Sequence, residues 1–177
     1  MPTEQEKAIQ ALRYAIQMEI DGKAFYLIAS RESGNELGKK LLESLANQED
    51  YHRQKFEQIY ENISKAKSWI PVEFKPDGGK TPRTIFAREI ENADSFAKGM
   101  QAEIDSIQIA MQMEDKSYDF YHNRSEQIGE GTERDFYVTV AAEEREHKLI
   151  LLDYYEFLKD PASWYVQTEH TSLDGGS

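Results

Sequence analysis

The chain repeats itself at a single fixed offset of 95 residues. Residues 15–19 read AIQME, and residues 110–114 read AMQME. We interpret the repeat as a tandem duplication of a unit of about 60 residues, so the fold has to be built from two similar halves. Without any gap, the same offset also pairs Phe25-Tyr26 with Phe120-Tyr121, Ser30 with Ser125, Gly34 with Gly129, Ala46 with Ala141, Glu49 with Glu144, His52 with His147, and Tyr60-Glu61 with Tyr155-Glu156.

Each unit is predicted to form two long helices. In the first unit, Thr3-x-x-Glu6 has the form of a capping box that starts a helix, and the Ser33-Gly34-Asn35 stretch breaks it. Apolar residues recur at heptad spacing, which is typical of helices that pack in a bundle. The sequence therefore predicts an all-α four-helix bundle of two helix hairpins, with helices over about 4–31, 36–62, 95–123 and 133–159.

The two hairpins are joined by a long segment, residues 63–94. A helix of about 26 residues is roughly 39 Å long, so a connection between side-by-side hairpins has to travel the length of the bundle. We expect residues 63–94 to form this crossover. A short helix near 82–91 is predicted within it, because Thr81-Pro82 has the form of a cap followed by a first-turn proline.

Residues 1–160 are expected to form one domain, and residues 161–177 a polar C-terminal tail. Asp160-Pro161 ends the last predicted helix of the bundle, because proline cannot continue it. In the tail, Trp164 and Tyr165 are expected to fold back onto the bundle.

Ionisable residues interrupt the apolar heptads at matching places in both halves. Burying an unpaired charge costs several kcal/mol. No Arg or Lys stands at the heptad positions of the helices over 36–62, 95–123 and 133–159 to offset that cost. The sequence thus predicts six ionisable side chains at one bundle centre, namely Glu19, Glu49, His52, Glu114, Glu144 and His147.

A dinuclear metal site accounts for this arrangement. Residues three apart on a helix share a face, so Glu49 and His52 reach one metal together, and Glu144 and His147 do the same from the facing helix. Four carboxylates carry about −4, and two divalent ions neutralise them. A Glu from each of two helices with Glu-x-x-His from each of the other two is the ligand pattern of di-iron carboxylate bundles.

With these residues, the chain resembles the ferritin-like superfamily and, within it, the rubrerythrin-like proteins, over roughly residues 3–159. The resemblance implies a ferritin-like four-helix bundle with a crossover and two iron ions that react with peroxide or dioxygen. It also implies that Glu19 and His52 bind one iron, that Glu114 and His147 bind the other, and that Glu49 and Glu144 bridge the two. The residues alone do not choose iron over manganese or zinc.

Two departures from the family pattern affect the expected chemistry. The chain contains no cysteine, so it lacks the four-cysteine rubredoxin-type centre of rubrerythrins. Its electrons are expected to come from another protein or from Fe(II) itself. Rubrerythrins also tend to carry a carboxylate three residues after the Glu of the third helix. That position is Ser117 here, with Gly22 as its repeat mate, and we expect the two small residues to leave a cavity for a small substrate.

Other residues near the six have more ordinary expected roles. Tyr26 and Tyr121 are predicted to be core tyrosines with satisfied hydroxyls, the alternative being a hydrogen bond to a ligand carboxylate or a radical role. Glu143 and Glu146 flank Glu144 but point off its face, so they are expected on the solvated surface.

Composition excludes several kinds of partner. The formal net charge is −12, which disfavours binding to nucleic acid. No apolar run is long enough to span a membrane, and the opening MPTEQEKAIQ has no apolar stretch of the signal-peptide kind. We therefore expect a cytoplasmic protein. We also expect it to form a homo-oligomer, namely a dimer.

The predicted function is a non-haem di-iron oxidoreductase of the peroxidase or ferroxidase type, with dioxygen or hydrogen peroxide as substrate. The main alternative is a non-catalytic protein that stores or delivers iron. A third possibility is an interaction protein whose metal only supports folding.

Overall fold

The computed structural model confirms the all-α prediction. It describes residues 1–94 and 99–174, with side chains up to residue 169, and this part of the chain contains helices and no strands. Within it, no helix combines the length and the apolar character needed to cross a membrane. The helices are α1 (Glu4–Glu32), α2 (Glu36–Ala66), α3 (Lys80–Ile90), α4 (Gln101–Ile128), α5 (Thr132–Lys159) and α6 (Pro161–Asp174).

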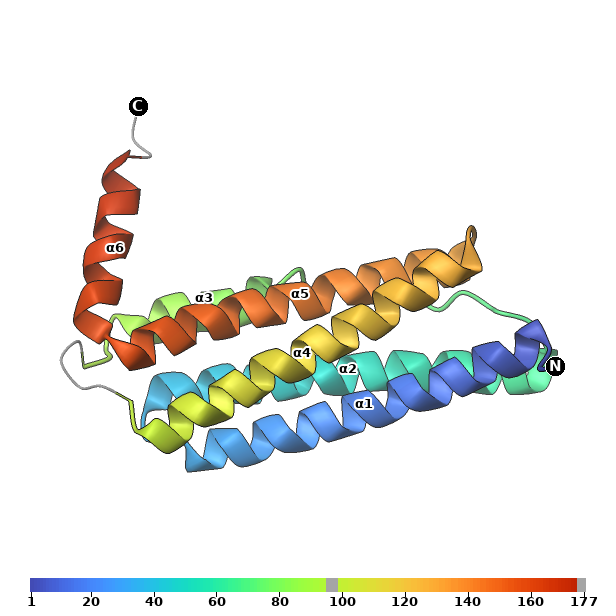
Figure 1. Cartoon of the computed structure of the whole chain (residues 1–177), viewed down its shortest axis with the longest axis horizontal. Helices are drawn as coiled ribbons and strands as arrows, with labels where there is room; N and C mark the ends of the chain where they lie inside the picture. Colours follow the sequence, from blue (N-terminus) through green and yellow to red (C-terminus); the bar gives the residue numbers. More distant parts are fainter. Residues whose placement is uncertain (95–98, 175–177) are drawn as a thin grey trace.

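The four long helices form the bundle as two antiparallel hairpins (Figure 1). α1 packs along α2, α4 packs along α5, and α1 also lies against α4. The crossover leaves α2 at the end of the bundle where the N-terminus lies, and α3 runs back against α2 and α5 towards the opposite end (Figure 1). This is the expected ferritin-like arrangement of two hairpins joined by a long connection.

Two helix ends lie beyond the predicted bounds. α2 continues to Ala66 and ends at Lys67, which has a left-handed φ of 59° and donates its N–H to the carbonyl of Ile63. α4 continues to Ile128 and ends at a glycine with positive φ; near this end, Arg124 is buried and pairs with Glu133. Residues 95–98, where the sequence predicts the start of this helix, lie outside the described residues.

The segment that the sequence assigns to a polar tail begins as a helix, α6. Pro161 takes its first position, where a missing N–H is harmless, and Asp160 caps it by accepting the backbone N–H of Ser163. The ring of Trp164 packs edge-on against Phe86, with 5.5 Å between centroids. α6 then projects away from the bundle (Figure 1).

The apolar core is divided into two clusters by the polar centre. Along each helix, one cluster precedes the ionisable residues and the other follows them. In α2, for example, Leu41 and Leu45 belong to the first cluster, whereas Phe56 and Ile59 belong to the second. Glu49 and His52 lie between them. The two clusters hold the four helices together on both sides of the centre.

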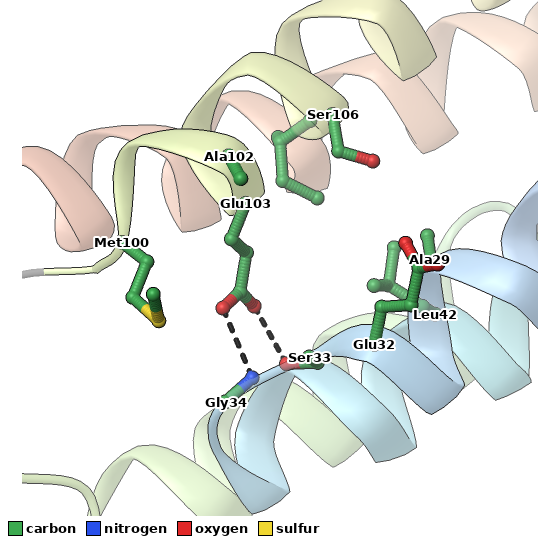
Figure 2. A pocket seen from close by; sticks show the side chains of 10 residues that line it. Ala29, Glu32, Ser33, Gly34, Leu42, Met100, Ala102, Glu103 and Ser106 are labelled. Atoms are coloured by element: carbon green, nitrogen blue, oxygen red, sulfur yellow. Dashed lines mark hydrogen bonds between the residues drawn. The ribbon is translucent and has the colours of Figure 1, made fainter.

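A hydrogen-bond network fixes one end of the bundle. Glu103, near the start of α4, accepts the hydroxyl of Ser33 at 2.6 Å and the backbone N–H of Gly34 at 3.1 Å (Figure 2). It also accepts a hydrogen bond from the hydroxyl of Tyr154, which in turn accepts one from the side-chain amide of Asn35. A cavity of about 170 Å³ lies beside this network and contains none of the six predicted site residues.

Candidate metal centre

The structure brings all six predicted site residues together. Glu19 comes from α1, Glu49 and His52 from α2, Glu114 from α4, and the remaining pair from α5. None of the six residues is more than 3% exposed. The heptad spacing accounts for this convergence, because each residue occupies the inward stripe of its helix at the same level of the bundle.

The six side chains form two groups of four that share two members. Glu19, Glu49, His52 and Glu144 form one group, and Glu49, Glu114, Glu144 and His147 form the other; in each group one ligand atom per residue lies within 4.8 Å of the others. The shared residues are Glu49 and Glu144, the pair that the family resemblance assigns as bridges. Each group has the donor set of a carboxylate–imidazole metal site.

Both imidazole rings turn the same nitrogen towards the carboxylates. Nδ1 of His52 lies 3.0 Å from Oε1 of Glu144 and 3.6 Å from Oε2 of Glu19. Nδ1 of His147 lies 3.1 Å from Oε1 of Glu49 and 3.6 Å from Oε1 of Glu114. The two rings are stacked, with 5.6 Å between their centroids.

Nine of the twelve side-chain oxygen and nitrogen atoms of the six residues are buried and lack hydrogen-bond partners. The short contacts between Nδ1 and carboxylate oxygens do not have hydrogen-bond geometry, and no Lys or Arg among the described residues pairs with the four carboxylates. Buried polar atoms are almost always satisfied, so a group of orphaned ones calls for an unseen partner. Divalent cations fit, because carboxylate oxygens and imidazole nitrogens are their protein ligands. The orphaned atoms are Oε2 of Glu19, Oε1 of Glu49, Oε2 of Glu114, both oxygens of Glu144 and both ring nitrogens of His52 and His147.

In the absence of a metal ion, the electrostatics of the centre favour protonation of several of its side chains. Burial, with repulsion from Glu49 and Glu144, raises the pKa of Glu19 well above its usual range. Burial and the charge of Glu144 raise the pKa of Glu114 to about 8. Burial opposes protonation of the two histidines, but the surrounding carboxylates outweigh it and raise the pKa of both imidazoles.

Two buried tyrosines hold the carboxylates that are not shared. The hydroxyl of Tyr26 donates to Glu114, and that of Tyr121 donates to Glu19, so each tyrosine reaches across to the opposite half. Both tyrosines therefore pack in the core, as predicted, and each also forms the hydrogen bond to a carboxylate of the centre that was the alternative. The repeat offset pairs these tyrosines and these glutamates, so it indicates equivalent contacts in the two halves, but only the structure shows that the contacts cross between the halves.

Glu143 is not on the solvated surface, contrary to expectation. It is 2% exposed and accepts the backbone N–H groups of Asp77 at 3.1 Å and Gly78 at 2.7 Å. The crossover passes over this face of α5 and covers it, which the periodicity of α5 alone does not reveal. Glu146 is half-buried and pairs with Arg83 of α3.

The expected cavity beside Gly22 is filled by Glu49. A Cβ atom on Gly22 would lie 2.8 Å from Oε2 of Glu49, so any larger side chain would displace this shared carboxylate. The absence of a side chain at Gly22 therefore makes room for the candidate metal-ligating carboxylate of Glu49, and not for a substrate. Its repeat mate, Ser117, is half-buried.

Comparison with known proteins supports this interpretation of the centre. A family model described as Rubrerythrin matches residues 10–155, which is about four-fifths of the chain and includes all six residues. No curated protein and no solved structure matches the chain.

The shared position of Glu49 and Glu144 predicts that each serves both metal ions. Glu49→Ala or Glu144→Ala should therefore lose metal from both positions, whereas Glu146→Ala, at the neighbouring surface, should retain two ions per chain. Elemental analysis after metal loading and desalting measures the difference. Full retention of one ion in either of the first two variants would refute the bridging assignment.

The raised pKa values predict how pH affects the metal-free protein. Glutamate ordinarily titrates at 4.5 and histidine at 6.5, so the folded state holds more protons than the unfolded state above these values. Its stability should then fall as pH rises from about 5 to 8, and saturating Mn(II) should reduce that fall because the ions replace the protons.

Thermal unfolding at several pH values, with chelator and with Mn(II), tests this dependence. Glu114→Gln should flatten the slope of the metal-free protein, since it removes one group with a raised pKa, and Glu91→Gln on the surface should leave the slope unchanged. A melting temperature of the metal-free protein that stays level or rises over this pH range would contradict the prediction.

Proposed function

Because the chain belongs to the rubrerythrin family, we propose that it is a di-iron oxidoreductase that reduces hydrogen peroxide or dioxygen. The observation that carries this proposal is the pair of four-residue groups that share Glu49 and Glu144, with the side chains buried and most of their oxygen and nitrogen atoms unpartnered. A merely structural metal needs one closed site. Two adjacent sites with common carboxylates suit a reaction that takes two electrons.

Each half of the duplication would contribute to both positions. Glu19 and His52 would hold one ion, Glu114 and His147 the other, and the two shared carboxylates would lie between them. Iron bound there would supply the two electrons that convert hydrogen peroxide to water, one from each ferrous ion. Two protons are consumed in the same conversion.

The protein side chains have three tasks in this proposal. The tyrosine hydroxyls of Tyr26 and Tyr121 fix the orientation of Glu114 and Glu19, so that these carboxylates keep their free oxygens directed at the centre. The two apolar clusters exclude bulk water along the bundle axis. The high proton affinity of Glu19 and Glu114 allows the centre to exchange protons as its charge changes.

Electrons have to reach the centre from outside these 177 residues. The chain has no cysteine for an iron–sulfur centre and no glycine-rich phosphate loop for a nicotinamide cofactor. We propose a separate electron-donor protein, or Fe(II) itself, as the reductant, and a homo-oligomer as the working form.

The reaction is tested by single-turnover oxidation. Protein loaded anaerobically with two Fe(II) per chain should consume one hydrogen peroxide for each pair of Fe(II), faster than the same concentration of Fe(II) in buffer. Residual Fe(II) is measured with a colorimetric chelator, and peroxide is measured independently. NADH alone should not sustain turnover.

Glu146→Ala serves as the matched control and should react like the unmodified protein, whereas Glu144→Ala should not. Uptake of many more than two irons per chain into a large assembly would instead indicate storage. Protein that binds two Fe(II) but leaves them unoxidised by both peroxide and dioxygen would contradict the proposed reaction.

A further inference from the structure

Glu143 lies where the crossover meets α5, one residue before a shared carboxylate. Its two oxygens accept the backbone N–H groups of Asp77 and Gly78, at 3.1 and 2.7 Å. Gly78 and Gly79 have φ values of 64° and 74°, a left-handed conformation that suits glycine and shapes this turn. Successive backbone N–H groups in such a turn form a concave anion-binding nest. The orientation of the carboxylate is therefore set by the crossover as well as by α5.

The carboxylate of Glu143 faces Nε2 of His52, the ring nitrogen that points away from the metal centre. Oε2 of Glu143 lies 3.9 Å from Nε2 of the ring, while Nδ1 of the same ring faces the carboxylates of the centre. His52 is thus placed between the metal centre and Glu143. A shift of about 1 Å would bring the two atoms to hydrogen-bond distance. Histidines that bind metals typically donate their second N–H to such an acceptor, which fixes the ring and raises its basicity.

The other half of the molecule differs at the corresponding position. The repeat offset of 95 residues pairs Glu143 with Gln48, a neutral amide. Neither Nε2 atom has a hydrogen-bond partner, but Nε2 of His52 has the Glu143 carboxylate within 4.0 Å, whereas among the described residues Nε2 of His147 has no carboxylate within that distance. The duplicated halves therefore supply the same ligands to the two positions but a different environment behind each histidine.

We propose that Glu143 is a positioning residue for His52 and makes the two metal positions unequal, with the tighter one at His52. This inference rests on the proposed two-metal centre and adds to it an order of loading. The first ion goes to the position formed by Glu19, Glu49, His52 and Glu144. The second ion goes to the position of His147, so the chain distinguishes two sites that its duplication made alike.

The test is a Zn(II) titration of the metal-free full chain, with a competing chelator to resolve the two binding steps. In Glu143→Gln, the amide oxygen can still accept the N–H of Gly78, whereas the N–H of Asp77 loses its acceptor and the charge facing His52 is lost. The tighter step should weaken by about 10- to 100-fold, and the weaker step should change little. Glu146→Gln, three residues along α5, is the matched control and should leave both steps unchanged.

A second measurement needs no variant. In the Zn(II)-loaded protein, ¹⁵N NMR of the histidine rings should show a proton on Nε2 of His52 that exchanges with solvent more slowly than the one on His147. Unchanged binding steps in Glu143→Gln, equal weakening of both steps, or equal exchange at the two rings would each overturn the inference while leaving the two-metal site intact. If the unmodified chain binds no Zn(II), Mn(II) or Fe(II), the proposed function fails and this inference fails with it.

Discussion

Four carboxylates buried side by side, with two histidines but no described Lys or Arg paired to them, are the constraint on which the rest of the structure depends. Ionised carboxylates repel one another, and each loses the stabilisation of water when it is buried. Protons or cations have to supply the missing positive charge. The raised pKa values of Glu19 and Glu114 describe the first solution, and the convergence of unpartnered oxygen and nitrogen atoms describes the second. Two divalent ions would neutralise the cluster and would also partner the orphaned oxygen and Nδ1 atoms that face it.

The surrounding fold is arranged so that this costly centre can persist. Apolar clusters hold the helices together on both sides of it, and the network around Glu103 fixes one end of the bundle. Tyrosines from each half restrain a carboxylate of the other half, and the crossover closes over His52 through Glu143. The duplication supplies equivalent ligands from both hairpins, whereas the single crossover makes their surroundings different. The same topology therefore produces equivalent metal-binding side chains in the two halves and different surroundings for His52 and His147.

The two hairpins and their polar centre could be predicted from the sequence, because the 95-residue offset and the heptad spacing determine them. The 95-residue repeat and the heptads predict two hairpins, and Glu49 and His52 at apolar positions predict a polar centre. The position of Glu143 could not be predicted in this way, because adjacent residues on a helix point about 100° apart and only the path of the crossover buries that face. The cavity expected beside Gly22 is absent for a related reason. A missing side chain indicates space in the sequence, but only the structure shows that Glu49 fills it.

The most direct test of the metal centre is anomalous X-ray scattering from crystals of iron-loaded protein, recorded on both sides of the iron absorption edge. The two-metal assignment predicts two anomalous peaks between the four long helices, one beside Nδ1 of His52 and the other beside Nδ1 of His147, with the carboxylates of Glu49 and Glu144 between them. The absence of peaks there, or a single peak bound by surface carboxylates alone, would contradict it.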